Sequence, residues 1–124
     1  MPKEMKEINW LADVEAHNYT AAESYLGLVY PAAQVAMMVA NLKSTSLVQF
    51  KSKDIFRASQ LPLLGVSNSH VEKNREKIRD GKSFSPILLV RDTSNGKVVI
   101  ADGYHRMCAI YEHNEDAFIQ CKIV

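Results

Sequence analysis

The spacing of apolar residues changes from helix-like to strand-like near residue 47. Residues 32–43 are predicted to form a helix, and Pro31 suits the first position of such an element. One face of this helix carries four apolar residues at the spacing i, i+3, i+4 and i+7: Val35, Met38, Val39 and Leu42. Because proline disrupts a helix interior, an earlier helix is expected to end or kink near Val29.

The earlier helix is predicted to begin at Thr20. Thr20 and Glu23 form a capping box, in which each side chain accepts a hydrogen bond from the backbone N–H of the other residue. Residues 1–17 form a mixed-charge lead, and Trp10 is expected to anchor it onto the core. Neither helix carries a catalytic pattern. We therefore interpret them as structural, or as a surface for a second copy of the chain or another protein partner.

Strand-like runs and turn signals dominate the chain after residue 47. They predict a strand over 47–51, its continuation or a single helical turn over 53–59, a loop over 61–65, and a helix over 70–80. Residues 67–69 supply polar N-caps for the last helix, and Gly81 ends it. Its clearly apolar residues are Val71 and Ile78, and its basic and acidic residues alternate, which predicts a solvated face with local ion pairs.

The final third of the sequence predicts a hairpin, a helix and a closing strand. The expected elements are strands over 86–91 and 98–100 joined at Asn95-Gly96, a helix over 104–113 closed by Asn114 in the left-handed conformation, and a strand over 118–124. The sequence therefore predicts the α+β class. We expect a single domain over residues 1–124, with an N-terminal helical extension over 1–49 and a core of small mixed sheet and packed helices over 50–124.

Composition narrows the function classes. The 15 basic and 14 acidic residues nearly cancel, so the chain lacks the broad positive field of a protein devoted to duplex DNA, and charge does not favour nucleic-acid binding. The two cysteines, Cys108 and Cys121, and the four scattered histidines show no metal-ligand spacing, so no metal site is predicted. The cysteines allow one disulfide, but a reduced chain is the simpler expectation.

The sequence also predicts a cytoplasmic protein that does not enter a membrane. Residues 1–6 carry mixed charges in place of an apolar stretch, so no signal peptide is expected. No apolar run approaches the ~20 residues that a bilayer span requires.

Polar chemistry is concentrated in residues 97–109. A β-branched run leads directly into Asp102-Gly103, and the predicted helix that follows carries His105 and Arg106 in its first turn. The start of a helix presents unpaired backbone N–H groups and the positive end of the helix dipole, and glycine lets a ligand approach the backbone. A guanidinium adds a planar fork that suits phosphate or carboxylate. This stretch therefore predicts an anion-binding site.

The C-terminal part, over residues 50–124, resembles the ParB/sulfiredoxin superfamily. The order of elements matches, and so does the turn Gly103-Tyr104-His105-Arg106-Met107-Cys108-Ala109. The glycine, the arginine and the final alanine are shared with ParB proteins and with sulfiredoxins, and the histidine is shared with sulfiredoxins. Residues 1–49 lie outside the resemblance.

The resemblance implies a nucleotide-phosphate site at this turn. ParB binds CTP there, sulfiredoxin binds ATP, and related free-serine kinases bind ADP or ATP, which implies a nucleotide with Mg²⁺ as the ligand. Gly103, Tyr104, His105 and Arg106 would then contact phosphate, and His70 lies where sulfiredoxins place a basic nucleotide contact. Tyr104 stands where sulfiredoxin has its reactive cysteine and ParB a glutamate, so sulfinic-acid repair is not expected and CTP hydrolysis of the ParB type is in doubt. Asp102 resembles the acidic turn residue of the free-serine kinases, which makes it the candidate catalytic group.

Each candidate also has a structural interpretation. Arg106 could pair with Asp102 or Asp92, Asp102 could cap the helix, and His105 and His70 could serve packing. The favoured function is a phosphate-binding protein that hydrolyses a nucleotide or transfers a phosphoryl group to a small molecule. The alternative is a non-catalytic accessory module that binds a protein or DNA partner through its N-terminal helices.

Overall fold

The computed structural model describes residues 6–65 and 68–124, which form five helices and two sheets. The helices are α1 (Ala16–Leu26), α2 (Ala32–Ser44), α3 (Ser52–Ser59), α4 (Ser69–Arg79) and α5 (Tyr104–His113). The strands are β1 (Asn9–Trp10), β2 (Val48–Lys51), β3 (Ser83–Phe84), β4 (Ile87–Asp92), β5 (Lys97–Asp102) and β6 (Phe118–Ile123). The fold is therefore mixed α+β, as the sequence predicts.

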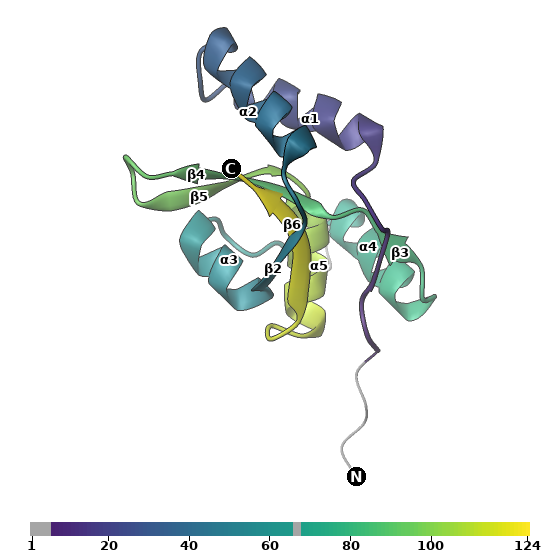
Figure 1. Ribbon diagram of the computed structural model, residues 1–124. Coiled ribbons are helices and arrows are strands. Elements are labelled where there is room, and N and C mark those ends of the chain that lie inside the picture. The colour runs from purple at the N-terminus through teal and green to yellow at the C-terminus, as the bar shows by residue number, and fades with distance from the viewer. Residues whose placement is uncertain (1–5, 66–67) are drawn as a thin grey trace.

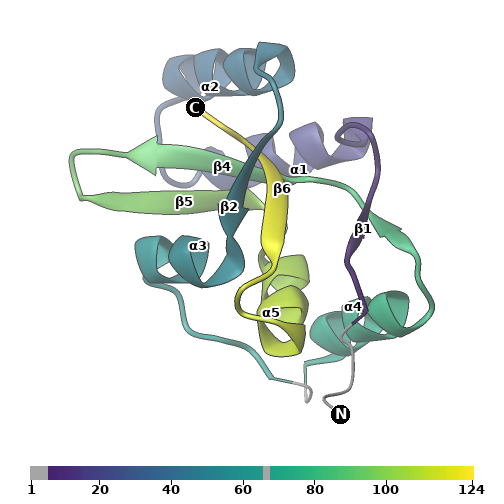
Figure 2. The ribbon, with the colours of Figure 1, turned by 60° about the horizontal axis from the view of Figure 1, so that its bottom comes forward.

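The main sheet has the strand order β2-β6-β4-β5 (Figures 1 and 2). The pairs β2–β6 and β4–β5 are antiparallel, whereas β4 and β6 are parallel. Strand β4 is buried on both faces: Ile87 and Leu89 join one core cluster, and Leu88 and Val90 join the other. Burial on both faces explains why the sequence shows an uninterrupted apolar run here instead of an alternating one.

Two layers of helices cover the two faces of this sheet. In Figure 1, α1 and α2 lie above the sheet, and α3, α4 and α5 lie below it. The upper layer packs through Ala22, Leu26, Val35, Val39 and Leu42. The lower layer contributes the following buried residues: Ile55, Phe56, Val71, Ile78, Met107 and Ile110. Across the described ranges, none of these helices is long and apolar enough to cross a lipid bilayer.

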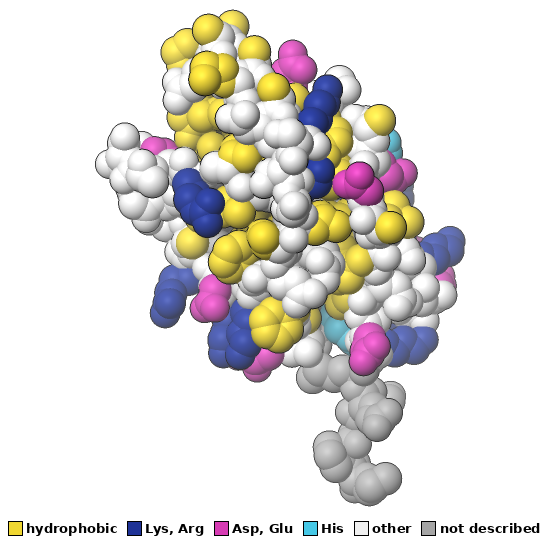
Figure 3. Space-filling model, in the orientation of Figure 1, with side chains coloured by type: hydrophobic (Ala, Val, Ile, Leu, Met, Phe, Trp, Pro, Cys, Tyr) yellow, Lys and Arg dark blue, Asp and Glu magenta, His cyan; other side chains and the backbone are white. Residues whose placement is uncertain are grey.

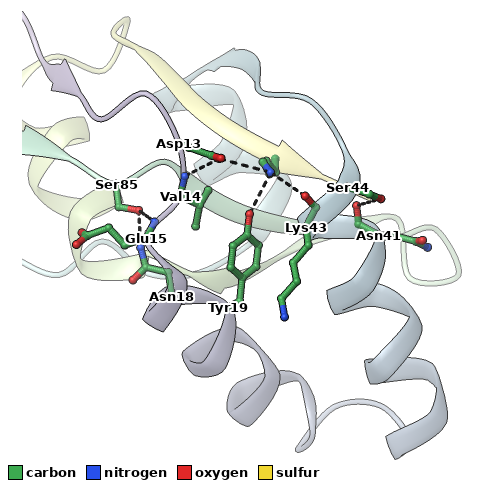
Figure 4. A network of polar contacts seen from close by, with 10 residues as sticks. Asp13, Val14, Glu15, Asn18, Tyr19, Asn41, Lys43, Ser44 and Ser85 are labelled. Carbon is green, nitrogen blue, oxygen red and sulfur yellow. Dashed lines mark hydrogen bonds and ion pairs between the residues drawn. The ribbon is translucent and has the colours of Figure 1, made fainter.

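A buried lysine joins the upper layer to the sheet. Lys122, on β6, is 5% exposed. Its Nζ donates to the Tyr19 hydroxyl at 3.0 Å and to the Lys43 carbonyl at 3.3 Å, and it lies 3.6 Å from the Asp13 carboxylate (Figure 4). The ammonium group thereby finds partners on α1, on α2 and on the segment before α1, which offsets the cost of burying a charge.

The start of α1 corrects the sequence analysis. The helix begins at Ala16 with Glu15 as its N-cap residue, so Thr20 and Glu23 lie inside it and the predicted capping box is wrong. Starting earlier places Asn18 in the interior, where its Nδ2 donates to the Ser85 Oγ at 2.5 Å. A tertiary contact thus decides where the helix begins. The helix also ends earlier than predicted, at Leu26 rather than near Val29.

Helix α2 and the hairpin confirm local patterns. Pro31 is the N-cap residue of α2, and Val35, Val39 and Leu42 form its buried face. Strands β4 and β5 pair on either side of the turn at Asn95-Gly96. Trp10 packs against Phe84 with ring centroids 6.1 Å apart, which confirms that it anchors the lead.

Several local predictions are wrong or lie outside the described residues. Residues 52–59 form the eight-residue helix α3, because Ile55, Phe56 and Ser59 bury one of its faces. Asn114 is extended, with φ −160°, and does not adopt the left-handed conformation. Asn68 is the N-cap residue of α4. The predicted contribution of Ser67 and the charged start at residues 1–5 lie outside the described residues. Among the described residues, Cys108 and Cys121 are free and buried, so the predicted disulfide alternative is not formed.

Candidate functional site at the start of helix α5

Gly103 makes the sharp turn from β5 into α5. Its φ is +110°, a backbone conformation that favours glycine, and it occupies the N-cap position of α5. A Cβ atom here would lie 2.5 Å from the Ile87 Cδ1 and 2.9 Å from the Arg106 Nη2. Both the backbone conformation and the space around it therefore require glycine. The turn brings the first residues of α5 close to the strand that precedes it.

Arg106 pairs with Asp102 at the base of this turn. The Arg106 Nη2 donates to the Asp102 Oδ2 at 2.6 Å, and Nη1 donates to the Ser85 carbonyl at 2.8 Å. The two side chains are only 13% and 17% exposed. The structure thus shows Arg106 in an ion pair with Asp102, which is one of the structural interpretations of this residue. The guanidinium still holds an Nε–H and a second hydrogen on each terminal nitrogen, which are donors available for a ligand.

Burial shifts both ionisation equilibria of this pair. Burial raises the pKa of the Asp102 carboxyl, and the charge and hydrogen bond of Arg106 offset part of that shift. Burial also lowers the pKa of Arg106, against the effect of Asp102. The predicted capping role of Asp102 is wrong, because Gly103 is the N-cap residue and the carboxylate turns to Arg106 instead. Asp102 therefore fixes the orientation of the guanidinium.

A cavity of about 440 Å³ opens beside this pair. It is lined by residues from four parts of the chain: Glu15, His17 and Asn18; His70, Asn74 and Lys77; Ser85; and Asp102, Gly103, Tyr104, His105 and Arg106. All six candidate site residues of the sequence analysis, His70 and positions 102–106, lie in this lining. The chain thus brings His70 to the turn from a position more than 30 residues earlier.

Two histidines meet at the edge of the cavity. The rings of His70 and His105, from the first turns of α4 and α5, have centroids 4.9 Å apart. Burial and the neighbouring His70 lower the pKa of His105 below its ordinary value. The positive end of the helix dipole at the start of α5 also disfavours the charged form of a histidine there, in the same direction as burial and the second histidine.

Tyr104 is held by the loop over residues 61–65. Its hydroxyl donates to the Pro62 carbonyl, and burial raises its pKa. The ring also lies beside His105, with centroids 5.6 Å apart. Tyr104 therefore forms an aromatic wall of the cavity, while its phenolic oxygen is engaged with the backbone.

Sequence reasoning missed six residues of the lining. Three come from the start of α1, namely Glu15, His17 and Asn18. The buried Ser85 accepts from the Glu15 N–H at 3.0 Å and from Asn18, which fixes α1 against the site (Figure 4). No local signal could reveal contacts between residues so far apart in sequence. By contrast, His70, Asn74 and Lys77 share the spacing i, i+4, i+7 on α4, and this signal was available.

The charges of the lining balance. Lys77 and Arg106 are basic, Glu15 and Asp102 are acidic, and three histidines also line the cavity. Within residues 6–65 and 68–124, no group of three or more His, Cys, Asp or Glu residues is placed to hold a metal ion.

No protein-family model matches the chain, and neither a search of curated proteins nor one of solved structures found a match. The resemblance to the ParB/sulfiredoxin superfamily remains a prediction from the sequence. The residues of the cavity are what support a function.

Proposed function

We propose that this cavity binds the phosphates of a nucleotide. The observation that carries the proposal is the convergence of His70 from α4 with residues 102–106 from the β5–α5 turn around one cavity. These six residues follow from the sequence resemblance, and the lining of the cavity is an independent observation about them. We also propose that residues 50–124 adopt the ParB/sulfiredoxin-like fold, with α1 completing the site.

The start of α5 supplies donors for the phosphate oxygens. The first bond within the helix runs from the Met107 N–H to the Gly103 carbonyl at 2.9 Å. The N–H groups of residues 104–106 precede that bond, so they belong to the unpaired first turn that favours anions. Arg106 and Lys77 add charge from two sides. Phosphate would therefore lie at the start of α5, next to the N–H groups of residues 104–106.

Asp102 is the proposed catalytic group for nucleotide hydrolysis or phosphoryl transfer. Its Oδ2 is engaged with Arg106, which leaves Oδ1 to orient an acceptor hydroxyl or a water on Mg²⁺. Mg²⁺ would then be held mainly by the phosphates, since the lining offers few ligands. Under this proposal, the reaction is nucleotide hydrolysis or phosphoryl transfer to a small molecule.

Calorimetric titration with ATP, ADP, CTP and GTP, each with Mg²⁺, tests the binding. Lys77→Ala should weaken binding about tenfold, because a charged donor to phosphate is lost. Lys73→Ala is the matched control: Lys73 is exposed on the same helix but lies outside the lining, so affinity should not change. Replacing both members of the buried pair, Asp102→Asn with Arg106→Gln, should abolish binding without leaving a buried charge unpaired. Absence of binding by the wild-type chain at millimolar nucleotide would overturn the proposal.

The alternative is a non-catalytic module that acts through α1 and α2. The exposure of Leu28, which is 87% accessible at the tip of the two helices, favours a protein partner. A DNA partner is disfavoured, because residues 24–42 contain no Lys or Arg to meet phosphates. Nucleotide titration separates the two functions, since only the first requires the cavity.

A further inference from the structure

Helix α2 carries apolar residues on both its inner and its outer side. Its inner face packs Val35, Val39 and Leu42 against the sheet. Its outer side presents four exposed apolar residues at helical spacing, Ala33, Ala36, Met37 and Ala40, next to the uncharged polar residues Gln34 and Asn41. An apolar stripe on a helix is normally buried against another surface. Only one side of α2 is buried by this chain, so the outer side lacks a covering surface among the described residues.

The apolar surface continues around the tip of the hairpin that α1 and α2 form. Leu28 is 87% exposed, Met37 is 67% exposed, and Tyr25 and Val29 are nearly half exposed. In Figure 3, hydrophobic side chains gather at the top of the molecule, where Figure 1 places this hairpin. Four of the large exposed hydrophobic side chains thus fall within 13 consecutive residues, 25–37. Contiguous exposed apolar surface of this kind marks an interaction site.

The charge pattern identifies the occupant. Residues 24–42 form a run of 19 positions without a single charged residue. A charged partner surface would lose its hydration here and gain no counter-charge, so the matching surface must be uncharged as well. The longest uncharged stretch of this chain is this same hairpin. Two uncharged hairpins placed face to face would therefore bury no charge. A two-fold axis brings the same surface of both copies together, so one self-complementary surface is enough to form a dimer.

We propose that the outer surface of the α1–α2 hairpin is the interface of a homodimer. The small alanines of α2 allow two such helices to approach closely, and two hairpins together make a four-helix layer between two sheets. A membrane surface is a poorer occupant, because a helix that lies on lipid needs Lys or Arg beside its apolar face. The site cavity uses the opposite end of α1, about 15 Å from the tip along the helix, so the dimer leaves it open.

Sedimentation equilibrium on the full chain tests the proposal. The wild type should show a concentration-dependent dimer. Leu28→Glu and Met37→Glu should each raise the dimer dissociation constant at least about tenfold, because each places a charge at the centre of the interface. Leu63→Glu is the matched control: Leu63 is 45% exposed but lies in the loop before α4, and its substitution should leave the dimer unchanged.

Three results would overturn the proposal. One is a wild-type chain that stays monomeric up to about 1 mM. Another is a dimer that both hairpin variants leave intact while their thermal unfolding shows that they are folded. The third is flotation of the wild type, but not of Leu28→Glu, with neutral phosphatidylcholine vesicles, which would make lipid the occupant. Nucleotide binding is measured separately, so its failure and the failure of the dimer are distinguishable.

Discussion

The two helical layers expose different kinds of side chain to water. In the lower layer, α4 buries Val71 and Ile78 and turns its charges outward, where Arg75 lies 3.7 Å from Glu112. In the upper layer, α2 turns alanines and a methionine outward and has no charged residue before Lys43. The two helices have comparable lengths, and each packs against a neighbouring helix, α4 against α5 and α2 against α1. The difference is what the proposed dimer would explain, because a second copy would cover the apolar residues that the upper layer exposes.

The same difference separates the two proposed functions. Chemistry-bearing side chains gather where α4 and α5 meet the start of α1, and the far end of the hairpin carries none. Ligand binding and self-association therefore use different ends of α1. A change at one end should leave the other function intact.

The largest expected loss of stability comes from truncating a side chain on the inner face of the upper layer. Leu42→Ala should cost about 2–5 kcal/mol of unfolding free energy, because Leu42 is fully buried and the truncation leaves a cavity. Urea denaturation in dilute solution measures it. Met37→Ala, on the outer face of the same helix, should change the monomer by less than about 0.5 kcal/mol. Equal losses for the two variants would contradict the division between the inner and outer faces.

The turn of the lower layer should be the next most sensitive position. Gly103→Ala should cost about 3 kcal/mol, since it combines a φ of +110° with a contact of 2.5 Å to Ile87. Gly96→Ala serves as the control, because Gly96 also has a positive φ but no atom within 4 Å of the added Cβ. It should cost only about 1 kcal/mol. A Gly103 variant as stable as the Gly96 variant would show that the turn has room for a side chain.

Substitutions near the starts of helices should lower the stability less, and they should affect the two layers differently. Asn68 accepts hydrogen bonds from the N–H groups of His70 and Val71 at the start of α4, so Asn68→Ala should cost about 1 kcal/mol. Thr20 lies inside α1 and is exposed, so Thr20→Ala should change stability by less than about 0.5 kcal/mol. Thermal unfolding of both variants gives the comparison. A larger loss at Thr20 would restore the capping box that the sequence predicts.

The smallest expected effect is a dependence on pH that arises in the lower layer. The pKa of His105 is lowered in the folded state, so the unfolded chain takes up this proton more readily. Stability should therefore be full above the ordinary pKa of 6.5 and should fall as the pH drops from there through the folded value. Melting temperatures of the wild type and His105→Gln between pH 8 and pH 5.5 should diverge only at the acidic end. Parallel curves would show that His105 does not contribute.

Bound phosphate should oppose this loss. An anion in the cavity favours protonated His105, so its affinity should rise by up to about tenfold per pH unit as the pH falls toward the lowered pKa of His105. Titration of inorganic pyrophosphate at pH 8 and at pH 6 measures this coupling. Binding that is strong and has the same pH dependence in the wild type and in His105→Gln would mean that the anion lies away from His105.

The sequence predicted those features that are encoded within a few residues of each other. The buried face of α2, the turn at Asn95-Gly96 and the sharp turn at Gly103 all depend on local spacing and on backbone preference. The start of α1 was mispredicted because Asn18 bonds to Ser85, 67 residues away, and this contact outweighs a local capping pattern.

The candidate site also contains residues that the sequence could reveal and residues that only the tertiary structure brings together. Positions 102–106 could be chosen because they are contiguous, and His70 through the resemblance. Glu15, His17 and Ser85 could not, because only the docking of α1 on the sheet brings them to the cavity. The sequence left Arg106 to contact phosphate or to pair with Asp102 or Asp92, and the structure shows the pair with Asp102, in which the Arg106 side chain is only 13% exposed.

The order of strands also determines how this chain can fold. Strand β6, the last strand in sequence order, lies in the interior of the sheet and is the link between β2 and β4. The β4–β5 hairpin can form on its own, but β2 has no place in the sheet until β6 is inserted. Lys122 and Ile119 on β6 also contact the upper and lower layers, respectively. The sheet therefore cannot grow strand by strand in sequence order, because β2 joins it only through the last of the described strands.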